Sequence, residues 1–303
     1  MKKYLSYFIV VVLLFSFVSS IAYATQEEKF DIVKAKKELM EKAENSTKRI
    51  TKKSQDEIDY ILARMTSEGV NQDVIAKEVE KYGIYKLEIP NEVKGDYVNS
   101  LSTDNTDVTM TDPAVYYDYN KKQWVVVGGG YWHSNDWLQY VPAIWTGGGH
   151  EGSTVDVGGR DGFGLGYTNT SGTYNTLVKS VYAYISDGLG NESYTKNRSD
   201  GDGRKGIGFE IQDKLRARKK VGTYWPPDTS EFSYIGKHFA GLARYNSNFA
   251  NYDGIATTYY IHTYESASIQ SVDFGVQGQS AGVKATLINK QYSFPAYSDD
   301  TGF

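Results

Sequence analysis

The sequence predicts a mainly β protein: an antiparallel β-sandwich or barrel preceded by a small α-helical N-terminal segment. Between residues 25 and 88 the chain is rich in Lys and Glu and places apolar residues at helical spacing. After Pro113, Tyr, Gly, Thr, Ser and Asn dominate, and apolar residues recur at intervals of two. The strand patterns follow one another without helical patterns between them, which is typical of antiparallel sheets.

The first 24 residues have the features of a cleaved secretion signal. Two lysines precede an apolar run from Tyr7 to Ala22, and the run ends in Ala-Tyr-Ala, which supplies the small residues that a signal peptidase reads. The alternative is a membrane anchor, but the run is short for a span of about 20 residues. We therefore expect residues 1–24 to be a signal peptide and the protein to be secreted and extracellular.

Residues 25–88 are expected to form a helical segment. Ile58, Leu62 and Met65 recur at helical spacing, Asn71 is placed to cap a further helix, and Gly83 is placed to end it. Residues 89–113 are polar and poor in large apolar side chains, and they are expected to form a linker.

Residues 114–303 are expected to form one Tyr/Gly-rich antiparallel β domain. Residues 115–119 and 123–127 flank a short polar turn and predict a hairpin. Residues 177–185 and 255–264 alternate as strands do. Residues 269–287 give the clearest hairpin, with apolar residues on one face of both arms.

Composition excludes several classes of function. The chain has no Cys, so disulfides, zinc-thiolate sites, iron–sulfur clusters and thiol nucleophiles are excluded. Lys plus Arg number 33 against 37 Asp plus Glu, a net charge of −4, which argues against a dedicated nucleic-acid binder. A cysteine-free export is more typical of bacteria than of animals, and we expect a bacterial protein.

Local motifs predict no catalytic residues, no metal site and no cofactor. Residues 278–282 fit the G-x-S-x-G elbow, but a strand follows where a helix is required, so a plain hairpin turn is favoured. Residues 201–206 fit G-x-G-x-x-G without a helix after them. His133 and His150 follow triple glycines and have Asp136 and Asp161 near in sequence, but no fixed ligand spacing orders them.

The strongest local signal is a cluster of aromatic residues between positions 116 and 145. Trp and Tyr combine an apolar ring with a polar edge, so exposed members can stack on sugars, enter a membrane interface or anchor a partner. Most rings of such a cluster fill the interior of a sandwich. The predicted exposed, binding members are Tyr131, Trp132 and Trp137.

A basic block is the second candidate site, predicted to contact an anionic surface. It comprises Lys214, Arg216, Arg218, Lys219 and Lys220. The alternative is an ordinary solvated loop or helix end. Near an anionic membrane each such side chain contributes about 1 kcal/mol.

The hairpin at residues 269–287 carries a third possibility. Its arms have about the nine to eleven residues that a tilted transmembrane strand needs, with one apolar face. A hairpin that covers a hydrophobic core has the same pattern.

These features together favour a secreted, non-enzymatic protein that acts at cell envelopes, with an antibacterial or cytolytic, membrane-perturbing action as the leading hypothesis. Its expected partners are anionic lipids, wall polymers or glycans of a bacterial envelope, and oligomerisation on a membrane is compatible with it. The first alternative is a surface adhesin or polysaccharide-binding module. The second is a secreted hydrolase whose carboxylates meet only in the fold, because glycosidic carboxylates leave no local motif.

Overall fold

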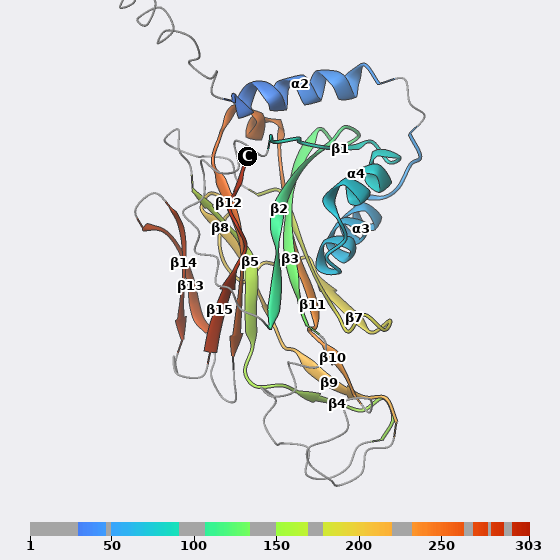
Figure 1. The fold of residues 1–303 in the computed structure, drawn as a ribbon, viewed down its shortest axis with the longest axis vertical. Coiled ribbons are helices and arrows are strands. Elements are labelled where there is room, and N and C mark those ends of the chain that lie inside the picture. The colour runs from blue at the N-terminus through green and yellow to red at the C-terminus, as the bar shows by residue number, and fades with distance from the viewer. Residues whose placement is uncertain are drawn as a thin grey trace, which may run out of the picture. The chain divides into compact units, whose positions relative to one another are not determined.

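The chain folds into two antiparallel sheets packed face to face, with helices covering the outer face of one of them (Figure 1). A computed structural model describes residues 30–46, 50–90, 107–133, 150–168, 178–219, 232–263, 269–277, 280–287 and 293–303. The mainly β, antiparallel fold with a helical segment before it confirms the predicted fold class.

The helix-covered sheet has six strands in the order β1-β2-β3-β11-β6-β7. All neighbours in it are antiparallel, and its central strands come from distant parts of the sequence. The strands are β1 (Ile84–Lys86), β2 (Val108–Asp118), β3 (Gln123–Trp132), β11 (His238–Tyr245), β6 (Ser180–Ser186) and β7 (Glu192–Thr195).

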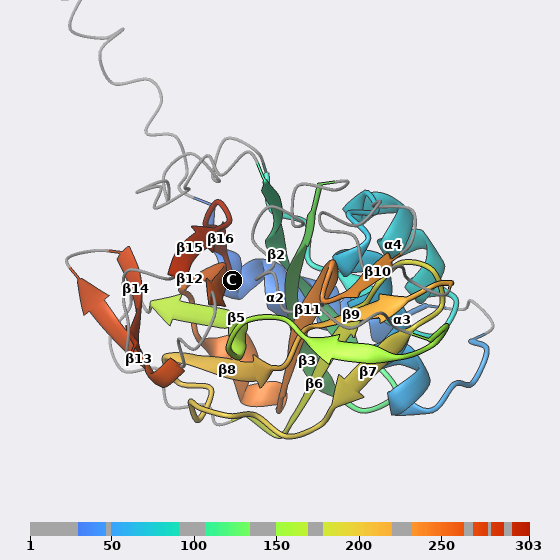
Figure 2. The ribbon, with the colours of Figure 1, turned by 90° about the horizontal axis from the view of Figure 1, so that it is seen from below.

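The second sheet has the order β15-β12-β5-β8, and β16 also pairs with β12. A small sheet, β10-β9-β4, and a separate hairpin, β13-β14, complete the strands that the structure describes. Figure 2 shows the small sheet and the hairpin well apart from each other. The bounds are β15 (Ser293–Tyr297), β12 (Ile255–Thr263), β5 (Asp161–Thr168), β8 (Gly206–Ile211), β16 (Thr301–Gly302), β10 (Phe232–Ile235), β9 (Lys214–Ala217), β4 (Thr154–Asp156), β13 (Ile269–Gln277) and β14 (Ser280–Leu287).

The two predicted hairpins are confirmed. In the first, β2 pairs with β3 so that Asp118 stands opposite Gln123. Its turn is held by Asp118 Oδ1, which accepts a hydrogen bond from the Lys121 amide at 3.0 Å, and Lys122 adopts a positive φ of 52°. In the second, β13 pairs with β14.

The triple glycine of β3 lets the two sheets approach closely. A Cβ atom on Gly128 would lie 2.1 Å from Thr258 Oγ1 on β12 and 2.9 Å from Leu165 Cδ2 on β5. A side chain there would force the sheets apart, so the glycine run serves packing rather than a ligand.

The helical segment contains α2 (Ile32–Glu44), α3 (Gln55–Ser67) and α4 (Gln72–Glu80). Ser54 and Glu57 form a capping box at the start of α3, and the predicted cap Asn71 accepts a hydrogen bond from the Asp73 amide. Helices α3 and α4 bury one face against the helix-covered sheet. This core includes Ile58, Leu62, Ile75, Val79, Tyr116, Val125, Tyr182 and Leu242.

Strand β2 begins at Val108, inside the stretch 89–113 that was expected to be a linker, and β1 joins the helical segment to the sheet. Residues 32–303 form one compact unit. The predicted signal peptide, residues 1–24, lies outside the described residues, among which no helix is long and apolar enough to cross a bilayer.

A buried ion triad fixes α3 to the sheet. Arg244 on β11 donates from Nε to Asp59 Oδ1 of α3 at 2.7 Å, and from Nη1 to Asp118 Oδ2 at 2.8 Å. The guanidinium and the Asp118 carboxylate are fully buried. Because a charge removed from water is stable only when it is paired, both carboxylates require Arg244.

A buried lysine fixes α2. Lys36 Nζ donates hydrogen bonds to the carbonyls of Phe249 and Tyr252 at 3.2 and 2.7 Å, and lies 4.3 Å from the centre of the Phe249 ring. The Trp124 and Phe303 rings lie 5.9 and 5.2 Å from the same nitrogen. Burial lowers the pKa of Lys36 to about 7, although Asp253 opposes the shift.

We predict that Arg244→Met destabilises the protein by about 3–5 kcal/mol, because it leaves two carboxylates buried without a cation. Lys196→Met is the matched control. It breaks the other ion pair between α3 and the sheet, Lys196 to Asp56 at 2.6 Å, but both of its side chains are about half exposed, and we expect a loss below about 1 kcal/mol. Chemical unfolding measures both losses, and equal losses would contradict a structural role for the triad.

We predict that Lys36 makes stability rise with pH above neutrality. The native pKa is about 7 and the ordinary value is 10.5, so between these values the unfolded chain binds more protons than the native one. Stability then increases by at most about 1.4 kcal/mol per pH unit in that window. Unfolding midpoints at pH 6, 8 and 9.5 measure the rise, and Lys36→Met removes it; a rise that persists in the variant would assign it to another group.

Candidate functional site

The predicted basic block contributes to a solvent-filled hollow on the small sheet. We call it the arginine hollow; its volume is about 600 Å³. Arg216 and Arg218 lie in its wall, together with polar and apolar groups from the turn before β4, from β10 and from the loop after β6. The lining residues are Glu151, Gly152, Leu189, Asn191, Arg216, Ala217, Arg218 and Ser233.

The two arginines differ from Lys214, at the start of the same strand. Lys214 stands opposite Asp156 on β4, and the two side chains approach to 3.7 Å. Arg216 stands between Thr154 on β4 and Ser233 on β10, which offer hydroxyls in place of carboxylates. Among the described residues no ion pair joins Arg216 or Arg218 to an acid, and Glu151 is the acid in the lining.

Strand alternation explains the orientation of this block. Leu215 and Ala217 of β9 are buried, whereas Lys214 and Arg216 are partly exposed on the opposite face. Arg218 and Lys219 follow the strand and are exposed, and Lys220 lies outside the described residues. The structure therefore brings Arg216 and Arg218 together and leaves Lys214 neutralised.

The loop that carries Leu189 and Asn191 is held in shape by Asp187. Its carboxylate accepts hydrogen bonds from the Leu189 and Asn191 amides at 2.8 and 3.0 Å, and from the Asn191 side chain. Burial acts to raise the pKa of Asp187, but the hydrogen bond from Asn191 and those that accompany it outweigh burial and hold the pKa below its ordinary value. The hollow therefore has a fixed wall, from which Leu189 projects with 60 % of its surface exposed.

The predicted aromatic site is not borne out at Trp132. The indole is 1 % exposed, Tyr131 is half-buried beside His238 on the neighbouring strand, and Trp137 lies outside the described residues. Trp132 is buried because its Nε1 donates a hydrogen bond to the Tyr260 hydroxyl at 3.2 Å, which satisfies the polar edge that was expected to need water. Among the described residues, Tyr194 is an exposed ring that the sequence pattern did not indicate; it is 63 % exposed and stacked on Tyr182.

Beside Trp132 the fold assembles a buried cluster that no sequence spacing indicates. Asp161 opens β5, Asp213 lies between β8 and β9, and His262 lies near the end of β12. All three are at most 2 % exposed, and one potential ligand atom from each lies within 4.8 Å of the other two. These are the described residues that could hold a metal ion.

Most of the polar side-chain atoms in this cluster form hydrogen bonds. Asp161 Oδ1 accepts from the Thr263 amide at 2.9 Å, and Oδ2 accepts from the Tyr260 hydroxyl and lies 3.0 Å from His262 Nδ1. Asp213 Oδ2 accepts from the Tyr234 hydroxyl at 2.6 Å. Asp213 Oδ1 is fully buried and has no hydrogen-bond partner among the described residues.

Burial, and next the negative charge of Asp161, raise the pKa of Asp213 well above its ordinary value. Trp132 closes the cluster from one side, since its ring lies 5.0 Å from that of His262 and 6.2 Å from that of Tyr234, edge to face in both cases. Two carboxyl groups thus lie close together in a buried site.

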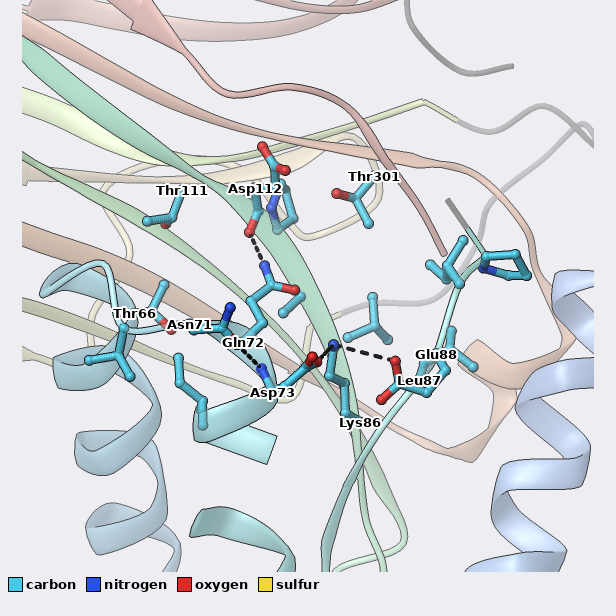
Figure 3. A pocket seen from close by; sticks show the side chains of 17 residues that line it. Thr66, Asn71, Gln72, Asp73, Lys86, Leu87, Glu88, Thr111, Asp112 and Thr301 are labelled. Atoms are coloured by element: carbon cyan, nitrogen blue, oxygen red, sulfur yellow. Dashed lines mark hydrogen bonds and ion pairs between the residues drawn. The ribbon is translucent and has the colours of Figure 1, made fainter. Parts of the chain in front are cut away.

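A larger pocket, of about 690 Å³, lies between the start of α4 and the middle of β2. Figure 3 shows that its polar side chains bind one another. Gln72 donates to the Asp112 carbonyl at 2.9 Å, and Lys86 lies 2.8 Å from Asp73 and 3.4 Å from Glu88. Because these groups are already paired, we place the candidate site in the arginine hollow.

Comparison with known proteins shows no family. No protein-family model matches the sequence, and no curated protein is similar to it. Among solved structures, the chain has a weak likeness to one described as "pH-induced modulation of Streptococcus parasanguinis adhesion by Fap1 fimbriae". The two are 10 % identical, the match covers 61 % of this chain and 77 % of that one, and the TM-score is 0.24, too low to carry an argument about function.

Proposed function

We propose that this protein is a secreted, non-enzymatic bacterial protein that acts at cell envelopes by binding anionic groups in the arginine hollow. The observation that carries the proposal is the pair Arg216 and Arg218, which line one hollow without an ion-pair partner among the described residues. In a chain with a net charge of −4, positive charge left unpaired in a concave, partly apolar surface favours an anionic ligand.

The chemistry of the lining fits phosphate or carboxylate groups. A guanidinium binds two oxygens of such a group at once, and Arg216 and Arg218 place two guanidinium-bearing side chains in one wall. The exposed Leu189 offers an apolar contact beside them. Bacterial envelopes present phosphate groups both in wall polymers and in acidic lipids, so the two sources need separate tests.

We predict that the protein binds vesicles containing phosphatidylglycerol, or soluble poly(glycerol phosphate), and that binding falls as salt rises. The double variant Arg216→Ser/Arg218→Ser loses about 2 kcal/mol, or roughly 30-fold in affinity. Glu151→Gln strengthens binding, because it removes the acid of the hollow. Vesicle sedimentation and titration calorimetry measure these changes.

The matched control is Arg160→Ser/Arg204→Ser, which changes the net charge equally. These arginines approach Glu210 and Asp202 to 3.3 and 3.4 Å, so the control is expected to change affinity little. An equal loss in both double variants would sink the hollow as the binding site. Binding to neutral polysaccharide that survives the loss of both hollow arginines would favour the polysaccharide-binding alternative.

We also propose membrane insertion as a second candidate function, which the separate hairpin favours. Strands β13 and β14 have nine and eight residues and pair with each other alone among the described strands. Their register sets Phe274 opposite Val283 and Val276 opposite Ala281, so these apolar positions share one face. The hairpin lies next to β5 and β12 but does not pair with them through backbone hydrogen bonds. It can therefore move away from the second sheet without breaking that sheet's hydrogen bonds.

We predict that Val283→Asp abolishes dye leakage from anionic vesicles, because a charge on the lipid-facing side of a β-hairpin costs about 2–4 kcal/mol at mid-bilayer. Thr286→Asp places the same charge on the opposite face and is expected to preserve leakage. Thermal unfolding of each variant separates loss of insertion from loss of folding. Intact vesicles with the unmodified protein at micromolar concentration would end this candidate function.

A further inference from the structure

We propose that Asp161, Asp213 and His262 bind a divalent transition-metal ion, of the class of Zn²⁺ or Mn²⁺, at the junction between the second sheet and the small sheet. The donors are one oxygen from each of two carboxylates and one imidazole nitrogen, a set that such ions accept. This inference is independent of the proposed envelope function. Because burial closes the site to substrates, the ion would have a structural role.

The geometry of the donors supports the site. Three atoms within 4.8 Å of one another have a common centre within about 2.8 Å of each, close to the 2.0–2.2 Å bonds of a zinc site. Asp161 is fixed through the Thr263 amide and the Tyr260 hydroxyl, as metal-binding carboxylates are in general. Small rotations of the side chains complete the approach.

Asp213 supplies the independent observation. Its Oδ1 is fully buried without a hydrogen-bond partner among the described residues, although a buried carboxylate oxygen normally has one. Its other oxygen is held by Tyr234. An oxygen held in this way beside a second carboxylate is available to a cation.

The charge of the site points the same way. Two aspartates and one histidine carry a net negative charge even when the imidazole is protonated, and buried charge is stable only when it is neutralised. The described groups that contact the two carboxylates are the hydroxyls of Tyr234 and Tyr260, the Thr263 amide and the His262 imidazole, of which the imidazole alone can carry a positive charge. A divalent ion neutralises the site, whereas Ca²⁺, which takes six to eight oxygens, finds too few.

The competing explanation is a proton shared by the two carboxylates, and the variant Asp213→Asn separates the two. An asparagine imitates the protonated acid and keeps an oxygen for Tyr234, but it removes one anionic ligand. If a proton neutralises the site, the variant is at least as stable as the parent protein and neither responds to metal. If a metal neutralises it, the parent alone responds.

The experiment treats the full secreted chain with EDTA, adds ZnCl2, MnCl2 or CaCl2 in turn, and measures bound metal by mass spectrometry and the Tm by calorimetry. We expect one Zn²⁺ or Mn²⁺ per chain, a higher Tm with either ion and no effect of Ca²⁺. Asp213→Asn should weaken binding more than about ten-fold and abolish the Tm shift. His262→Gln is the second variant, for the case in which Asp213→Asn does not fold.

Two controls address other metal sites. His133→Gln removes an exposed imidazole, and Asp300→Asn removes a buried carboxylate bonded to Thr257; both are expected to retain the metal. Parent protein that takes up no metal, or Asp213→Asn and His262→Gln variants that bind it as the parent does, would overturn the inference. Neither result bears on binding by Arg216 and Arg218, which is tested separately.

Discussion

The need to neutralise charge that is buried away from water is the constraint on which this structure depends most. The chain has no Cys and therefore no disulfide, so packing and polar pairing must hold its parts together. Arg244 is paired with two carboxylates, one from α3 and one from β2, and the same contacts dock the helix on the sheet. The charged form of Lys36 is stabilised only in part, by carbonyls and aromatic rings, and burial therefore lowers its pKa.

The same constraint separates the two sites of the β region. In the arginine hollow the side chains of Arg216 and Arg218 are partly or fully exposed, so their charge is stable in water without an acidic partner among the described residues. Around Asp161 and Asp213 water is excluded, so charge there must be neutralised within the protein. Solvent access thus distinguishes the hollow, for which we propose an anionic ligand, from the buried cluster, for which we propose a cation.

Sequence patterns predicted what is local. The period of two predicted both hairpins, because strand geometry is set by neighbouring residues. Partners distant in sequence were not predictable. The hydroxyl that buries Trp132 is 128 residues away, and Asp161 lies 101 residues from His262, so an exposed tryptophan was wrongly expected and the buried cluster was missed.

The buried cluster and the hollow are joined by two short strands. Asp213 directly precedes β9, and Tyr234, which donates to it, lies on β10 next to Ser233 in the wall of the hollow. Alternation along this pair of strands turns Leu215 and Tyr234 inward and leaves Arg216 facing the hollow. One pair of strands therefore contributes to both sites, with Tyr234 directed to the buried cluster and Arg216 to the hollow.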